Sequence, residues 1–352
     1  MSKKVLVAIS GGVDSSTAAL LLKKQGCEVM CAHMKLWVDV DNSVVKDSVA
    51  ACPMICDFLE VPFFLIDLSE QFKSSIIEYF VDEYKAGRTP NPCVKCNKEV
   101  KWMAFIKKAD ELGCDYIATG HYVRIEQLEG GRWAVKKGLD STRDQSYMLW
   151  RLSQNDLART LTPLGTYLKK DIREIARKNN LPTAEKNESR EICFIPDENY
   201  NRFLYEYEQK KGHRFGEGDI VHEDGRILGR HRGIPFYTIG QRRGMGIAHP
   251  TPLYVKKIDI ENNRIIVGDN DSLFQTEFMV GDINWVGTYP PREPFEAEVK
   301  IRYKHEAATA LIQPLADNTA RIVFKDNQRA VTPGQSAVFY GSDILLGGGI
   351  IL

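Results

Sequence analysis

Residues 5–24 read VLVAISGGVDSSTAALLLKK, and this stretch decides the fold of the N-terminal part of the chain. Its first five residues are apolar and largely β-branched, as in the buried strands of parallel sheets. Residues 15–25 carry apolar side chains at helical spacing. The glycines and serines of SGGVDSS separate the two patterns. The stretch therefore predicts a strand, a glycine-rich turn and a helix.

Strand-like and helix-like segments continue to alternate through residue 120. The pattern predicts strands at 29–34, 63–68 and 115–120, and helices at 70–86 and 98–112. Another helix is expected to begin near Cys52 and Pro53, because proline suits a first helical turn. This alternation indicates a parallel sheet covered on both faces. Ligands of such sheets bind beyond the carboxyl ends of the strands, where SGGVDSS lies.

The pattern changes near residue 214, where helical spacing fades. Short alternating strands are expected at 253–260, 263–269, 296–303, 320–326 and 335–340, separated by turn residues at intervals typical of small barrels. We therefore predict three domains: an α/β domain over 1–213, a central β domain over 214–275 and a C-terminal β domain over 276–352.

Composition limits the class of protein. The 352 residues carry 47 Lys+Arg and 47 Asp+Glu, so net charge does not indicate a nucleic-acid partner. No apolar run approaches the roughly 20 residues that span a membrane. A strand is expected almost at once, which leaves no room for a signal or transit peptide. Eight cysteines without a secretory signal indicate reduced thiols in the cytoplasm.

The glycine-rich turn has the features of a phosphate-binding loop. Gly11 and Gly12 permit close backbone approach to an anion, and the helix N-terminus favours phosphate. Asp14 is suited to hold a Mg²⁺ ion that bridges phosphate oxygens. Hydroxyl donors are supplied by Ser10, Ser15 and Ser16. The lysine of the Walker pattern and the GxGxxG pattern are both absent. The plainer alternative is an ordinary Gly-Gly turn capped by Ser and Asp.

A second motif, GRTPNPCVKCNKEVKW (87–102), contains Cys93 and Cys96. We expect a helix to begin just after Cys96, so that its N-terminus, with Lys95, Lys98 and Lys101, favours thiolates. Cys193 lies in SREICFIPDENY (189–200), again beside an arginine. No second CxxC or nearby histidine pair completes a zinc site. A packing role is expected for Cys27, Cys31, Cys52, Cys56 and Cys114.

These motifs together resemble known families. SGGVDSS resembles the loop of the N-type ATP pyrophosphatases, which split ATP into AMP and pyrophosphate to adenylate a substrate. TPNPCVKCN (89–97), ATGHY (118–122), RDQSY (143–147), EICFI (191–195), TIGQRRGMGI (238–247) and TPGQSAVFY (332–340) resemble the bacterial tRNA-uridine 2-sulfurtransferases of the MnmA type. The resemblance covers residues 5–352 in the family's motif order.

The resemblance implies ATP-dependent 2-thiolation of the wobble uridine, position 34, of tRNA. It implies an adenylating domain, a central β domain and a C-terminal β-barrel. Cys96 is then the nucleophile and Cys193 the persulfide carrier, and the two can form a disulfide. The sulfur comes from a donor protein, either a cysteine desulfurase or a sulfur relay protein. The expected ATP-binding residues are Ala8, Ile9, Ser10, Gly11, Gly12, Val13, Asp14, Ser15, Met34 and Gly120. The expected tRNA contacts are Asn91, Pro92, Cys93, His121, Arg143, Asp144, Gln145, Arg302, Tyr303 and Gln335.

The chain departs from the family pattern in two places. Some members have Asp in place of Cys93, so Cys93, Cys96 and Cys193 could instead hold a [4Fe–4S] cluster with one free iron. The region after Trp37 is short, and Ala51 stands where an Asp is common. The first difference concerns the cysteines, and the second concerns the loop on the ATP side.

Local charge favours an RNA partner although the net charge is zero. Residues 226–257 contain seven Lys or Arg and no Asp or Glu, and residues 85–108 have Glu99 as their only acid. Such stretches suit phosphate backbones. A solvated basic face is the alternative. Two rival functions stay open on the residues alone: an ATP pyrophosphatase that transfers ammonia, and a non-catalytic RNA-binding protein.

Overall fold

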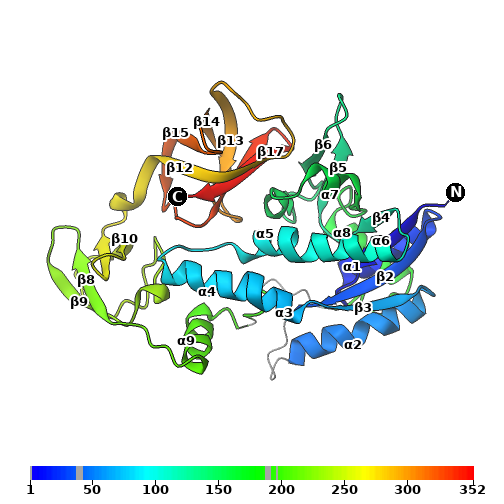
Figure 1. Ribbon diagram of the computed structural model, residues 1–352, viewed down its shortest axis with the longest axis horizontal. Helices are drawn as coiled ribbons and strands as arrows, with labels where there is room; N and C mark the ends of the chain where they lie inside the picture. The colour runs from blue at the N-terminus through cyan, green and yellow to red at the C-terminus, as the bar shows by residue number, and fades with distance from the viewer. Residues whose placement is uncertain (1, 37–42, 187–191, 196) are drawn as a thin grey trace.

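The computed structural model describes residues 2–36, 43–186, 192–195 and 197–352, with only the backbone of 43–49. The short region after Trp37 and the arginine beside Cys193, Arg190, lie outside the described residues. Figure 1 shows an α/β part, a small central sheet and a barrel, with two long helices running between them. The predicted fold class is confirmed.

The N-terminal sheet has five parallel strands in the order β3-β2-β1-β4-β7. They are β1 (Lys4–Ala8), β2 (Glu28–Lys35), β3 (Phe63–Asp67), β4 (Tyr116–Ala118) and β7 (Thr160–Leu161). Successive side chains of β1 enter different cores. Val5 and Val7 pack under α1 (Val13–Lys24) and α2 (Ser43–Phe58), whereas Leu6 packs under α6 (Met103–Glu111). Both faces are therefore covered, as parallel sheets require.

Two long helices each contain a π-helical turn. The first runs through α3 (Ser69–Phe72), the π turn Lys73–Ile77 and α4 (Glu78–Lys85). The second runs through α5 (Pro92–Cys96), the π turn Asn97–Trp102 and α6. The predicted helix over 70–86 is confirmed. Further helices are α7 (Gln154–Ala158), α8 (Lys169–Lys178) and α9 (Tyr200–Lys210), with 3₁₀ turns at Ser146–Leu149, Ile234–Phe236 and Asp271–Leu273.

Two predicted helix starts are wrong. The helix expected after Cys96 begins at Pro92, because Asn91 caps it by accepting a hydrogen bond from the Val94 amide (3.4 Å) and proline suits the first position. The helix expected to start near Cys52 begins at Ser43, and Pro53 lies inside it. A proline inside a helix removes one backbone hydrogen bond, and here the helix continues past it.

The C-terminal domain is a closed barrel of six strands. They are β12 (Phe274–Trp285), β13 (Phe295–Lys300), β14 (Ala308–Pro314), β15 (Ala320–Arg329), β16 (Ser336–Gly341) and β17 (Ile344–Ile351). The pairing of β12 with both β15 and β17 closes the ring. A hairpin from the α/β part, β5 (Val123–Gln127) and β6 (Trp133–Lys137), joins β17 where Lys136 pairs with Ile344. This hairpin was not predicted from the sequence.

The central sheet has four strands in the order β10-β11-β8-β9. They are β8 (Gly218–His222), β9 (Ile227–His231), β10 (Tyr254–Asp259) and β11 (Arg264–Gly268). Its core is continuous with side chains of α4 and α9 and with Cys96 and Phe194. In the part of the chain that is described, no helix combines the length and the apolar character needed to cross a membrane.

The barrel is hydrogen-bonded to the segment that leads into α5. The Gln335 side-chain amide donates to the carbonyls of Thr89 (2.9 Å) and Pro90 (3.2 Å), and the Thr89 amide donates to the Pro333 carbonyl (2.8 Å). Gly334 has φ +89°, and a Cβ there would lie 3.0 Å from Thr89 N. Glycine at this position therefore allows the two backbones to meet.

This contact predicts that Gly334→Ala lowers the free energy of unfolding substantially. Gly212 is the matched control, because its φ is +78° and a Cβ there would meet nothing within 4 Å. Gly212→Ala should cost roughly 1 kcal/mol for the left-handed conformation alone. Gly334→Ala should cost about 2 kcal/mol or more, because overpacking adds to that strain. Thermal unfolding of both variants measures the difference. Equal midpoints would show that the barrel contact is not tight.

Candidate active site

The phosphate-type loop lies at the carboxyl end of β1, as expected. Gly11 takes φ +74°, and Gly12 is the extended N-cap of α1. The Ser15 hydroxyl accepts a hydrogen bond from the Ser10 amide (3.1 Å) and lies 3.1 Å from the Ser10 hydroxyl oxygen. The loop is thus closed on itself while the first amides of α1 lack helical acceptors, which is the arrangement that binds anions.

Gly120 follows the end of the neighbouring strand β4 and presses on this loop. A Cβ on Gly120 would lie 3.0 Å from Ser15 N and 3.1 Å from the Asp14 carbonyl carbon. Any larger residue would push the loop away. Met34, near the end of β2, is half-buried. The structure therefore brings the predicted ATP-binding residues to one edge of the sheet.

Asp14 makes contacts that were not predicted from the sequence. The Lys169 ammonium contacts both carboxylate oxygens, at 2.6 and 2.7 Å, and the Tyr122 hydroxyl donates to one of them at 2.7 Å. Lys169 is buried and lies in the first turn of α8, 155 residues after Asp14. The only signals were a lysine at a helix start and the ATGHY motif. The Lys169 ammonium thus lies beside the phosphate-type loop, paired with Asp14.

Cys93 and Cys96 lie in the first turns of α5, and Cys193 lies in the loop before α9. Cys96 is buried, Cys93 is half-buried and Cys193 is exposed. An aromatic cluster fixes the Cys193 loop, because the ring of Phe194 packs on Phe72 (5.7 Å) and Phe80 (5.2 Å). Cys96 belongs to the same core. We call Cys93, Cys96 and Cys193 the thiol cluster.

The thiols are not activated in the resting protein, contrary to the prediction. Desolvation raises the pKa of Cys96 to about 11, and the positive charge of Lys101 lowers it only in part. Cys193 is an exposed residue, yet desolvation of its thiol raises the pKa to about 12. Burial also raises the pKa of Cys93. Loss of hydration outweighs the positive charges that the sequence places nearby.

Only one of the three expected lysines faces the thiols. Lys95 pairs with Glu99 (2.8 Å) and Lys98 pairs with Asp156 (2.6 Å). Lys101 instead interacts electrostatically with all three thiols of the cluster. Among the described side chains, no group of three or more His, Cys, Asp or Glu is placed to hold a metal ion. As described, the three thiols of the cluster are therefore not arranged as a set of ligands for a [4Fe–4S] cluster.

The residues expected to contact tRNA fall into two groups. Several hold the protein together: Asp144 accepts from Gly138 and Ser146, Gln145 accepts from the Tyr122 amide, and Gln335 holds Thr89 and Pro90. The second group includes Asn91 and Pro92, which directly precede Cys93, and Tyr303, which interacts electrostatically with Cys93 and with Arg143. Arg302 donates to the Arg329 carbonyl (3.2 Å), and His121 interacts with Lys101 beside the thiols. The Tyr303 hydroxyl donates to the Asp144 carbonyl (3.2 Å), so the two groups are connected.

His121 connects the ATP side to the thiol side. Its ring lies 5.5 Å from that of Trp102, and its Nδ1 lies 2.9 Å from the Thr119 hydroxyl. Burial, and then the charge of Lys101, lower the pKa of His121 to about 3. His121 is therefore a neutral ring at physiological pH.

Most charges of the two basic stretches are balanced by acids from elsewhere in the chain. Arg226 pairs with Asp224, Arg230 with Asp219, and Lys256 with Glu223. Arg242 and Arg243 are exposed and have no ion pair within the described chain. The surface available to RNA phosphates is thus smaller than the sequence suggests.

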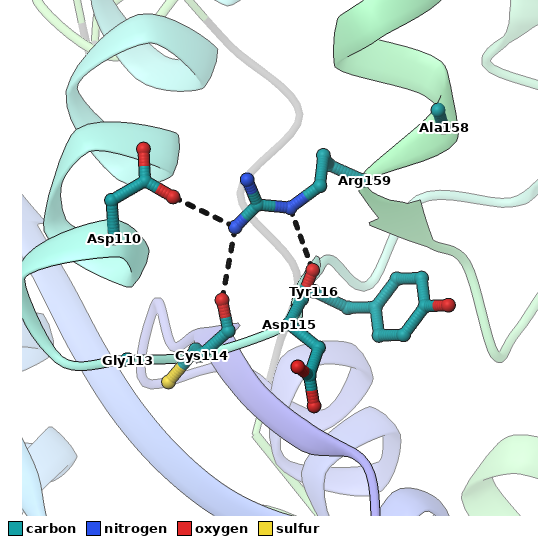
Figure 2. A pocket seen from close by; sticks show the side chains of 7 residues that line it. All are labelled: Asp110, Gly113, Cys114, Asp115, Tyr116, Ala158 and Arg159. Carbon is teal, nitrogen blue, oxygen red and sulfur yellow. Dashed lines mark hydrogen bonds and ion pairs between the residues drawn. The ribbon is translucent and has the colours of Figure 1, made fainter.

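A pocket at the other end of β4 is a structural feature (Figure 2). Arg159 fills it by donating to the carbonyls of Asp115 (2.6 Å) and Cys114 (2.9 Å) and to the Asp110 carboxylate (2.9 Å). The pocket lies where β4 begins, away from the carboxyl edge where ligands bind. Because the guanidinium is already satisfied, this pocket is not a second active site.

Comparison with known proteins identifies the family. A family model described as the tRNA methyl transferase HUP domain matches residues 3–197, its PRC-barrel domain matches 201–269, and an aminomethyltransferase beta-barrel domain matches 275–351. The tRNA-specific 2-thiouridylase MnmA 1 of Clostridium botulinum is 45% identical over 100% of this chain and 99% of its own. The chain belongs to the tRNA-specific 2-thiouridylase family.

Other members of the family are similar to this chain over the same length. The enzyme named tRNA-specific 2-thiouridylase MnmA from Clostridioides difficile is 44% identical over 100% of this chain and 98% of its own, and that from Lachnoclostridium phytofermentans is 43% identical over 99% of each. The resemblance found in the sequence motifs is confirmed.

The raised thiol pKa values predict how this family member reacts with iodoacetamide. Alkylation needs the thiolate, so the rate at Cys96 should rise about tenfold per pH unit from pH 7 to 9, without levelling, because its pKa is about 11. Peptide mass spectrometry follows each cysteine, with glutathione as the reference thiol. A rate that levels below pH 8 would show an activated thiolate instead.

Proposed function

We propose that this protein catalyses ATP-dependent 2-thiolation of the wobble uridine, position 34, of tRNA. One observation carries the proposal: a single segment, 119–122, touches both halves of the site. Gly120 presses on the phosphate-type loop and the Tyr122 hydroxyl binds Asp14. His121, between them, packs on Trp102 beside Lys101 and the thiol cluster. A base placed there can meet ATP and sulfur in turn.

The first step is adenylation of the uracil. Its 2-carbonyl is a poor electrophile, so O2 attacks the α-phosphorus of ATP, and the bond to pyrophosphate breaks with the electron pair leaving on pyrophosphate. The loop amides and the Lys169 ammonium are placed to stabilise the phosphate charge. Mg²⁺ bound with ATP would be held by Asp14 and would add positive charge to the phosphate oxygens.

The second step is sulfur transfer. Cys193 carries a persulfide whose terminal sulfur attacks C2, and AMP leaves with the electrons of the C2–O bond. The Cys96 thiolate then attacks Cys193 Sγ. The electron pair of the broken S–S bond returns to the base as a C2 thiocarbonyl, and a Cys96–Cys193 disulfide forms. An external dithiol reduces the disulfide and restores both thiols.

The placement of Cys193 supports loading by a donor protein, a cysteine desulfurase or a sulfur relay protein. Cys193 is the exposed cysteine of the cluster, so a donor persulfide can reach it and transfer its outer sulfur. A tRNA substrate and cysteines that must return to the reduced state fit the cytoplasm. The target base must leave its stack to enter the site, as in other enzymes that modify bases.

Three other functions compete with sulfur transfer. Methyl transfer is suggested by the description of the family model, and ammonia transfer and non-catalytic RNA binding are compatible with the phosphate-type loop alone. Transfer of a methyl group or of ammonia does not need two cysteines beside the adenylation loop. A non-catalytic RNA-binding protein would not need a closed loop with Asp14 paired to the buried Lys169. The thiol cluster therefore favours sulfur transfer.

Separating the two steps tests this function. Asp14→Ala should abolish tRNA-dependent pyrophosphate release. Cys96→Ser should retain that release in its first turnover and make no 2-thiouridine, because serine cannot form the disulfide. Isotopic pyrophosphate and nucleoside mass spectrometry measure the two steps. Thiolation by Cys96→Ser at the wild-type rate would refute the role of the cysteine.

The unpaired arginines predict the RNA surface. Arg242→Ala with Arg243→Ala should weaken tRNA binding and reduce the salt dependence of log Kd by roughly 1 to 2 in slope, because counterions are released from fewer phosphates. Arg226→Ala with Arg230→Ala is the matched control, since both arginines are paired with acids. Identical slopes for both double variants and wild type would place the RNA elsewhere.

A further inference from the structure

Lys101 stands out among the cations of the site. It is half-buried, and within the described chain it has no carboxylate partner. The lysines on either side of it along the same helix differ. Lys98 is neutralised by Asp156 (2.6 Å), and Lys107 is exposed. An unpaired ammonium kept out of bulk water is costly, so its position beside the thiols calls for an explanation.

The titratable groups that interact most with Lys101 are the three thiols, and they gain from its charge when they ionise. Burial alone would lower the pKa of the Lys101 ammonium, but its interactions with Cys96, Cys193 and Cys93 raise the pKa overall. The other titratable neighbour is His121, a neutral ring. Beyond Cys93 lie the Tyr303 hydroxyl and the Asp144 carboxylate. The Lys101 charge therefore acts on the two thiols of α5 and on the thiol of the Cys193 loop.

The π turn explains how Lys101 reaches Cys96. In an α-helix, five residues rotate a side chain by about 500°, which leaves it about 140° away from the first residue. The π turn Asn97–Trp102 has i→i+5 hydrogen bonds instead, and these bring residues five apart onto the same side of the helix. Lys101 thus lies one wide turn after Cys96, on the side of the thiols. Such turns occur often at functional sites.

We propose that Lys101 is the fixed cation that stabilises anionic sulfur during sulfur transfer. It acts on the persulfide of Cys193 before attack on C2 and on the thiolate of Cys96 before attack on Cys193. This inference rests on the proposed function and adds a residue to it. Lys101 enters no covalent step. Its role is that of a positioning charge: it favours the sulfur anion at the point where the reaction needs one, while burial keeps the thiols protonated at rest.

Three variants test the proposal. Lys101→Met removes the charge and keeps much of the length, and Lys101→Arg keeps the charge. Lys107→Met, on the exposed side of the same helix, is the control for loss of a lysine. Each protein is loaded with ³⁵S persulfide from a cysteine desulfurase, mixed with tRNA and ATP, and followed for a single turnover. Pyrophosphate release is measured in parallel.

We expect Lys101→Met to slow sulfur transfer by about tenfold or more, since loss of a nearby opposite charge raises a thiol pKa by about one unit or more. Its Cys96 alkylation rate at fixed pH should fall by a similar factor. Lys101→Arg should recover both rates, and Lys107→Met should match wild type. Pyrophosphate release should persist in all three variants.

Two results would overturn the proposal. One is a Lys101→Met variant with unchanged sulfur transfer. The other is slow transfer with an unchanged alkylation profile, which would mean that Lys101 only fills space. Failure of the proposed function looks different, because wild-type enzyme would then release no pyrophosphate with tRNA or would transfer no label to it.

Discussion

The site depends on a contact between the barrel and the segment that precedes Cys93. Residues 88–91 have no regular structure of their own, and they are held by backbone and side-chain hydrogen bonds from the barrel loop 332–336. The Tyr147 hydroxyl donates to the Ser336 carbonyl (2.9 Å), and the Trp150 indole donates to the Ser336 hydroxyl (3.0 Å), both in the buried interface. The barrel thereby fixes where α5 begins and where its two cysteines lie.

Burial and charge oppose each other at the thiols. Desolvation keeps them protonated, which protects buried sulfur from oxidation and from unwanted nucleophilic reactions. The charge of Lys101 lowers the pKa values of these thiols in part, but burial still keeps them above the ordinary value. At the phosphate-type loop, Lys169 pairs with Asp14. In both halves, a lysine lies beside the groups on which the proposed chemistry depends: Lys169 beside Asp14 and Lys101 beside the thiols.

The sequence predicted what local pattern encodes. Strand and helix alternation, the loop after β1 and the change near residue 214 all follow from spacing and residue type. Contacts between distant segments were not predictable: Lys169 lies 155 residues from Asp14, and the β5–β6 hairpin extends a sheet that is built from the other end of the chain. The helix start at Pro92 and the π turn after Cys96 were also missed, because hydrophobic periodicity does not distinguish α from π turns. The count of Lys and Arg overestimated the basic surface, because acids from other elements pair with several of these residues.

The central claim is that cysteine sulfur alone, activated within this site, thiolates an adenylated uridine. The most direct measurement is mass spectrometry of tRNA nucleosides after incubation with aerobically purified, iron-free enzyme, ATP, Mg²⁺, a cysteine desulfurase, cysteine and a dithiol reductant. The account predicts 2-thiouridine at position 34 over several turnovers. Enzyme that stays inert until iron and sulfide are rebuilt without oxygen would contradict it.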